Sequence, residues 1–114
     1  MASVTIGAEP SAVSFDPART ALVVIDMQRD FLEPGGFGEA LGNDVSLLRK
    51  AIAPCRAALA AARKAGLLVI HTREGHRPDM ADAPPAKVSR GAPSKRIGDS
   101  GPMGRILILS LIHI

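Results

Sequence analysis

Aromatic residues are scarce in this chain of 114 residues, which has no tryptophan, no tyrosine and three phenylalanines. Proteins that bind single-stranded nucleic acid stack the bases on aromatic side chains, so this scarcity argues against that class. The net charge of +3 is also too small to indicate a nucleic-acid partner by itself. We therefore expect no nucleic acid among the partners of the protein.

Cysteine is nearly absent as well, since Cys55 is the single cysteine of the chain. One cysteine cannot form an internal disulfide, and this favours a reducing compartment. No basic segment followed by an apolar run opens the sequence, so it shows no signal peptide. No uncharged apolar stretch reaches the roughly 18 residues that a membrane-spanning helix needs. We expect a cytoplasmic protein that does not enter the membrane.

One short apolar run, Leu22 to Ile25, leads directly into a carboxylate, Asp26. A continuous run of this kind predicts a strand at about 21–26 that is buried on both faces, as in a parallel sheet. Open α/β sheets bind ligands at the carboxyl ends of their strands, where Asp26 would lie. A carboxylate is costly to desolvate without a partner, so its place there indicates a function.

A helix is expected at about 45–65, after a glycine-rich loop at 27–43. Asn43 or Asp44 can cap its start, and Gly66 suits the left-handed residue that follows its end. Pro54 predicts a kink or a restart, because proline is unfavourable inside a helix. Apolar residues recur every three or four positions and predict one buried stripe; they are Val45, Leu48, Ile52, Cys55, Leu59 and Ala62.

A second buried strand is predicted at 67–72, which completes a strand–helix–strand unit. The two strands of such a unit are parallel and its crossover is right-handed. The carboxyl ends of parallel strands meet at one edge of the sheet. We therefore expect Asp26 and the segment 72–76 to converge at that edge.

The region 75–104 shows little periodicity and contains a basic cluster of Lys87, Arg90, Lys95 and Arg96. A loop this long is either functional or poorly ordered. The apolar run that begins at Arg105 predicts a third strand. Two or three strands with one long helix leave a sheet face uncovered, so we expect the N-terminal part of a larger α/β domain. Residues 109–114 resemble translated sequencing-adapter read-through, which would make them non-native; a natural edge strand is the alternative.

Several motifs in order carry a resemblance to a known family: VVIDMQRDFL at 23–32, GLLVIHTR at 66–73, GHRPDM at 75–80 and IGDSGPMGR at 97–105. Together they resemble the isochorismatase-like cysteine hydrolase superfamily, in its amidohydrolase branch with biuret hydrolase and ureidoacrylate amidohydrolase. The resemblance implies a three-layer α/β/α Rossmann-like fold. Residues 1–114 would then be a single hydrolase domain that is truncated at its C-terminus.

The resemblance also implies a chemistry for the complete protein. In this family a cysteine thiolate attacks a carbonyl carbon, an aspartate acts as general base and acid, and a lysine stabilises charge. Asp26 matches the aspartate, whereas the family lysine and cysteine lie further along than this sequence extends. The implied substrate is a small amide or ureide, no cofactor is implied, and the full-length protein is expected to be a homo-oligomer.

Each residue near the predicted edge of the sheet has two possible interpretations, one structural and one functional. Asp26 is interpreted as catalytic, although it could cap a turn. Gln28 could shape the loop or orient Asp26. Phe31 is either core or a wall of the substrate pocket, and Arg73 and Glu74 are either a surface ion pair or part of the pocket mouth. Asp30 is interpreted as a loop-capping acceptor.

Two further assignments are rejected on the residues themselves. Cys55 lies on the apolar stripe of the expected helix, roughly 15 Å from the strand ends at 1.5 Å per residue, and is interpreted as core. Glu74, His76, Asp79 and Asp82 form an incomplete set for a zinc-type site, which prefers several His or Cys donors, so no metal is expected. The alternatives to an amidohydrolase are an isochorismatase-like vinyl-ether hydrolase and a non-catalytic α/β fragment, which could bind nucleotides or anions through the basic loop.

Overall fold

The computed structural model describes residues 3–108, and these form two compact units. The first unit contains residues 3–25 and 52–72, and the second contains 26–51 and 73–108. The chain therefore crosses between the units at Ile25, at Ala51 and at Thr72. Each unit is described by itself.

The first unit opens with a two-stranded antiparallel hairpin. Strands β1 (Val4–Ile6) and β2 (Val13–Phe15) pair Val4 with Phe15. A short 3₁₀ helix, η1 (Pro17–Arg19), follows, and the Asp16 carboxylate accepts a hydrogen bond from the Ala18 N–H at 2.9 Å. This capped turn leads the chain into the next strand.

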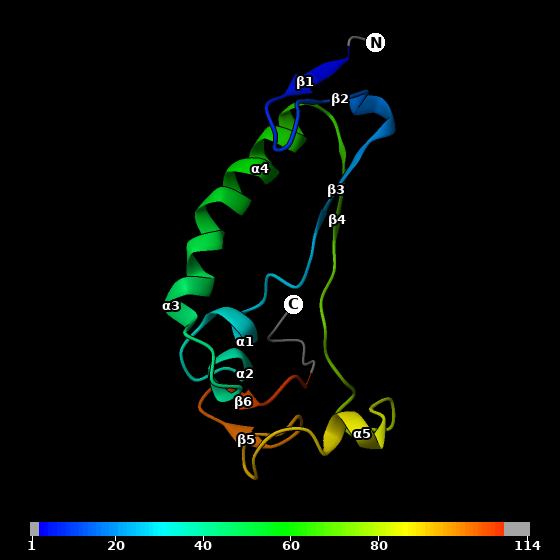
Figure 1. Cartoon of the computed structure of the whole chain (residues 1–114). Helices are drawn as coiled ribbons and strands as arrows, with labels where there is room; N and C mark the ends of the chain where they lie inside the picture. The colour runs from blue at the N-terminus through cyan, green and yellow to red at the C-terminus, as the bar shows by residue number, and fades with distance from the viewer. Residues whose placement is uncertain (1–2, 109–114) are drawn as a thin grey trace. The chain divides into compact units, whose positions relative to one another are not determined.

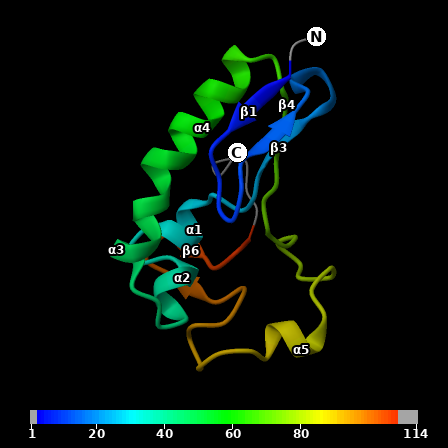
Figure 2. The same cartoon turned by 45° about the horizontal axis from the view of Figure 1, so that its top comes forward.

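Two parallel strands and one helix make up the rest of the first unit (Figures 1 and 2). Strands β3 (Ala21–Val24) and β4 (Leu68–His71) pair in parallel, with Ala21 opposite Leu68 and Val24 opposite His71. The helix α4 (Ile52–Lys64) joins them and packs against both. The predicted strand–helix–strand unit with parallel strands is therefore confirmed.

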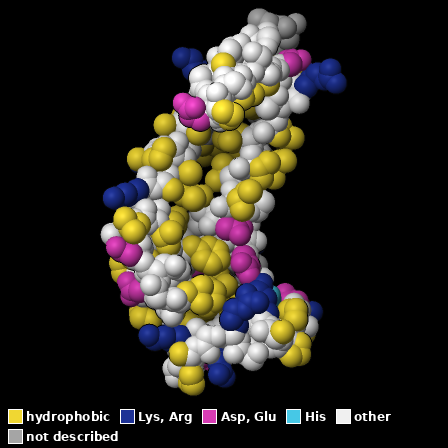
Figure 3. All heavy atoms as spheres, viewed as in Figure 1, with side chains coloured by type: hydrophobic (Ala, Val, Ile, Leu, Met, Phe, Trp, Pro, Cys, Tyr) yellow, Lys and Arg dark blue, Asp and Glu magenta, His cyan; other side chains and the backbone are white. Residues whose placement is uncertain are grey.

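The prediction that the first strand is buried on both faces is wrong. In β3, residues alternate between exposed and half-buried, and Val23 keeps 45% of its surface exposed. Leu68 in β4 is 63% exposed. The reason is physical, since a single helix can cover only one face of a two-stranded sheet. Figure 3 shows hydrophobic side chains at the surface along this strand pair.

The predicted helix at 45–65 is divided into three pieces. Helix α3 (Val45–Leu48) and the 3₁₀ helix η2 (Arg49–Ala51) precede α4. The restart predicted from Pro54 is confirmed, and it places this proline in the first turn of α4, where a missing N–H costs no intrahelical bond. Within α4 the residues that are not exposed are Ile52, Cys55, Leu59 and Ala62, as the stripe predicts. Leu48 of α3 also belongs to the predicted stripe, but it is exposed.

Both ends of this helical region are capped as expected. Asp44 accepts hydrogen bonds from the Ser46 N–H at 2.9 Å and from the Ser46 hydroxyl at 2.6 Å, and these bonds lower the pKa of the Asp44 carboxyl. Gly66 has a φ of 77°, in the left-handed region. The Leu67 N–H donates to the Ala62 carbonyl and the Gly66 N–H to the Arg63 carbonyl, which is a Schellman motif.

The glycine-rich loop folds into two short helices of the second unit, α1 (Arg29–Leu32) and α2 (Phe37–Ala40). Their phenylalanines meet, with the ring centroids of Phe31 and Phe37 6.4 Å apart. Phe37 belongs to the buried core of this unit, against which Phe31 packs. The other members of this core are Ile97, Ile106 and Leu107.

The region 75–104 also has short elements: helix α5 (Pro85–Val88) and the antiparallel pair β5 (Ser100–Gly101) and β6 (Gly104–Arg105). The prediction of a third strand from Arg105 is wrong for 106–108. Leu107 has a φ of 50°, which interrupts an extended backbone, and a single parallel bridge joins His76 and Ile108. The rest of that apolar run, 109–114, with the alternative of a natural edge strand there, lies outside the described residues.

Within residues 3–108, no helix has the length and apolar character that crossing a membrane requires.

Candidate functional site

Asp26 begins the second unit, two residues after β3 ends, and its backbone conformation is unusual. Its φ is 51°, in the left-handed region that residues other than glycine rarely adopt, although aspartate tolerates it better than most. The carbonyl of Asp26 accepts a hydrogen bond from the Gln28 N–H at 2.9 Å. Asp26 is half-buried. The turn at 26–28 therefore presents this carboxylate from a constrained backbone.

Gln28 connects this turn to the segment that follows β4. Its side-chain Nε2 donates to the Glu74 carbonyl at 2.8 Å, and its Oε1 accepts from the Glu74 N–H at 2.6 Å. A single amide therefore satisfies both backbone groups of one residue that lies 46 positions later. The predicted convergence of the Asp26 segment with 72–76 is confirmed by this contact. Gln28 forms hydrogen bonds with backbone, as expected if it shapes the loop, but the backbone belongs to a residue that is distant in sequence.

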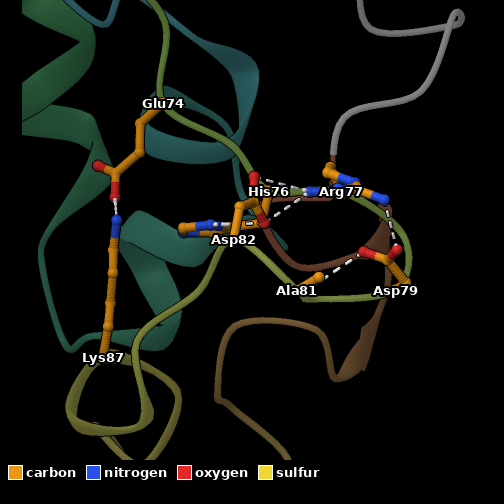
Figure 4. A network of polar contacts seen from close by, with 7 residues as sticks. All are labelled: Glu74, His76, Arg77, Asp79, Ala81, Asp82 and Lys87. Atoms are coloured by element: carbon orange, nitrogen blue, oxygen red, sulfur yellow. Dashed lines mark hydrogen bonds and ion pairs between the residues drawn. The ribbon is translucent and has the colours of Figure 1, made fainter.

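Glu74 directs its carboxylate to Lys87 of α5 (Figure 4). Both side chains are about one-third exposed, so the pair is partly shielded from water. Glu74 thus forms an ion pair, but its partner comes from the predicted basic cluster rather than from Arg73. Arg73 itself is exposed. Nothing in the local pattern of the sequence indicates that Lys87 reaches Glu74.

Phe31 and Asp30 both serve the packing of the second unit. Phe31 is half-buried against the core, which accounts for its burial without a ligand. The Asp30 carboxylate accepts a hydrogen bond from the Leu107 N–H at 3.3 Å. This bond matches the expected role of Asp30 as an acceptor for loop backbone. It also holds α1 to the buried residues near position 107.

His76 is a buried polar residue that the sequence did not single out as core. Its backbone N–H donates to the Leu107 carbonyl at 2.8 Å, and its Nδ1 lies 3.4 Å from Oδ1 of Asp82. That approach is within ion-pair range, but its geometry is not that of a hydrogen bond, and neither ring nitrogen has a hydrogen-bond partner among the described residues. Figure 4 shows the ring beside the Asp82 carboxylate.

The turn that follows His76 is held by its two aspartates (Figure 4). Both oxygens of Asp82 accept from the Arg77 N–H, at 3.1 and 3.3 Å, while Asp79 pairs with the Arg77 guanidinium at 2.7 Å. The hydrogen bond from the Arg77 backbone, with a smaller contribution from His76, lowers the pKa of the Asp82 carboxyl. Within 3–108, no three His, Cys, Asp or Glu side chains gather closely enough to hold a metal ion.

Cys55 lies in the other unit, half-buried within α4. This position accounts for the residue as part of the packing of that unit.

A comparison with protein families gives an independent result. A model of the isochorismatase domain matches residues 20–105 of this chain. The match spans β3, α4 and β4 as well as the turn of Asp26 and the Glu74 segment.

Proposed function

The chain belongs to the isochorismatase family, a family of hydrolases, and we propose that the complete protein hydrolyses C–N bonds in small amides or ureides. The proposed branch is the one that resembles biuret hydrolase and ureidoacrylate amidohydrolase. The fold proposed for the complete domain is the three-layer α/β/α arrangement, of which β3, α4 and β4 are one strand–helix–strand unit.

Asp26 is the proposed general base and acid. The observation that carries this role is its position, directly after a parallel strand and on a backbone turn tied to the segment after the neighbouring strand. Ligand sites of open α/β sheets lie at this end of the strands. In the proposed mechanism Asp26 accepts the proton of a cysteine thiol as the thiolate attacks the carbonyl carbon. It then returns the proton to the leaving nitrogen, which departs and leaves a thioester on the cysteine. A water molecule, deprotonated by Asp26, attacks the thioester carbonyl, and the proton goes to the departing thiolate.

The nucleophile in this proposal is not Cys55. Its thiol lies among the apolar residues of α4, whereas a reactive thiolate needs charged neighbours that lower its pKa. The catalytic cysteine and the charge-stabilising lysine have no matching positions in the motifs of this chain. We therefore propose that these 114 residues alone do not turn over substrate.

Substrate contacts are proposed for Phe31, Arg73 and Glu74. Arg73 is exposed and can donate to a carbonyl or carboxylate oxygen of a ureide. Glu74 is paired with Lys87, so their charges largely cancel and favour a neutral substrate. Phe31 would offer an apolar edge from α1. The proposed partners are thus a small molecule and, for the complete protein, further copies of itself.

The test uses the complete product of the gene that encodes this chain, supplied with biuret, ureidoacrylate, simple amides and isochorismate. We expect ammonia from an amide or ureide, and D26N should lower kcat by about 100-fold or more, as loss of a general base does. D30N is the matched control, because it removes the same charge four residues away and should leave kcat within about threefold.

Two results would overturn this assignment. Turnover of isochorismate with no release of ammonia from any amide would support the vinyl-ether alternative. Equal activity of D26N and the parent protein would remove Asp26 from the mechanism.

A further inference from the structure

The hydrogen bonds between the Gln28 amide and the Glu74 backbone form a clamp that local structure does not require. Gln28 stands at the N-cap of α1, where Ser, Thr, Asp and Asn are preferred because their side chains bond the first free N–H groups. The Gln28 side chain makes no such capping bond. Its amide forms hydrogen bonds with the Glu74 backbone instead. The residue type at this position therefore fits the clamp better than it fits the helix.

The clamp demands a side chain that both donates and accepts a hydrogen bond, which at neutral pH an amide does. Glu74 presents one backbone donor and one backbone acceptor, and the side chain opposite must offer one of each. Among neutral side chains, only those of Gln and Asn carry a carbonyl oxygen and an NH₂ group on one planar unit. A carboxylate can only accept hydrogen bonds. It would therefore accept from the Glu74 N–H, but its second oxygen would repel the Glu74 carbonyl oxygen.

The clamp acts on the backbone that presents Asp26. The Gln28 N–H bonds the Asp26 carbonyl at 2.9 Å, so the clamped residue and the left-handed residue belong to one turn. The left-handed conformation is unfavourable for any residue with a Cβ atom and persists where surrounding contacts enforce it. A side chain anchored on Glu74 is such a contact.

We propose that Gln28 is a positioning residue, whose amide clamps the Glu74 backbone and thereby keeps Asp26 in its left-handed conformation at the end of β3. This role rests on the proposed function only in that Asp26 is the acid–base group. Gln28 touches no reacting atom in this account. Its contribution to rate is the placement of the Asp26 carboxylate.

The structural test uses the chain with Q28L and Q28E, with N43D as the control. The Asn43 amide also bonds backbone of the same unit, donating to the Gly38 carbonyl at 3.0 Å, so N43D makes the same chemical change as Q28E at another site. We expect Q28L to speed hydrogen exchange of the Glu74 amide about tenfold, the loss of one hydrogen bond. It should also shift the backbone NMR signals of Asp26, and N43D should do neither.

The Q28E variant gives a readout that a change in packing would not give. At pH 7 the introduced carboxylate opposes the Glu74 carbonyl, and the Asp26 signals should move. At pH 3, below the ordinary glutamate pKa of about 4.3, the protonated carboxyl has an O–H donor and an acceptor, so the signals should return toward those of the parent. The parent protein at the same pH is the reference for each measurement, and the comparison does not depend on the folding of Q28L.

Turnover is measured separately, in the complete gene product. We expect Q28E to lower kcat about 100-fold at pH 7, the effect of a displacement of about 1 Å, with KM within about threefold. Asp26 signals that are the same in Q28E and in the parent at both pH values would overturn the clamp. An unchanged kcat would overturn the positioning role. A fully active D26N would instead refute the proposed function and leave the exchange results standing.

Discussion

Replacement of Gly38 by alanine should destabilise the second unit, although alanine favours helices. Gly38 is buried in α2, and an added Cβ would lie 2.9 Å from the carbonyl carbon of Phe31 and 3.1 Å from its Cα. Its closest neighbour would be the Phe31 carbonyl oxygen. Carbon atoms pack best at about 3.5–4.0 Å, so all three approaches are too close. The obstacle is backbone, which no rotamer change can move.

The expected magnitude is the difference of two terms. Overpacking of this kind costs about 1–3 kcal/mol, and the close approach to rigid backbone favours the upper half of that range. The helical preference for alanine over glycine offsets about 1 kcal/mol. The free energy of unfolding should therefore fall by about 1–2 kcal/mol. For a unit of this size, that is a fall of about 5–10 °C in the midpoint of thermal unfolding.

The assay is urea and thermal unfolding of G38A, followed by NMR signals of residues in the second unit. G7A is the control, because an added Cβ at Gly7 meets nothing within 4 Å. G7A should be neutral or more stable by up to about 1 kcal/mol, because the unfolded chain loses freedom. A G38A protein as stable as G7A would refute the account of how α1 and α2 approach each other.

Two further predictions concern the acidic turn after His76 and the end of α4. The lowered pKa of Asp82 means that its carboxylate stabilises the turn fully above the ordinary value of about 3.9, and that this stabilisation is lost as the pH falls through the lowered pKa. Hydrogen exchange of the Arg77 amide should therefore accelerate in acid, relative to its intrinsic rate. D82N should abolish this acceleration. The same pH dependence in D82N and in the parent protein would contradict the role of the Arg77 bond. G66A should lower the free energy of unfolding of the first unit by about 1 kcal/mol, because the φ of 77° at Gly66 suits only glycine well. An unchanged urea midpoint would argue against the Schellman cap.

Features encoded by neighbouring residues could be predicted from the sequence. The parallel strands follow from two apolar runs joined by a helix, and the restart before Pro54 follows from the missing N–H of proline. The caps at Asp44 and Gly66 follow from side chain and backbone chemistry within a few residues. These are local effects, so a single sequence contains the information.

Features that depend on distant partners could not be predicted in the same way. The bond between Asp30 and Leu107 and the pair between Glu74 and Lys87 have no local signature. The left-handed backbone of Leu107 is equally unexpected, because leucine in an apolar run favours a strand. In the candidate site, the position of Asp26 after a strand could be predicted from the pattern, and so could a role of Gln28 in shaping this turn. The partner of the Gln28 amide, the backbone of Glu74, could not be predicted.

The separation of 46 residues between Gln28 and Glu74 sets an order of events during synthesis. The chain emerges from its N-terminus, so β3, Asp26 and all of α4 are made before the partner of the Gln28 amide exists. Closing a loop of this length also carries an entropic cost that local helix formation does not. The turn of Asp26 therefore gains this contact only after the whole segment that becomes α4 has been synthesised. A ribosome-bound chain that ends at Lys64 contains the carboxylate but not the contact that holds its backbone.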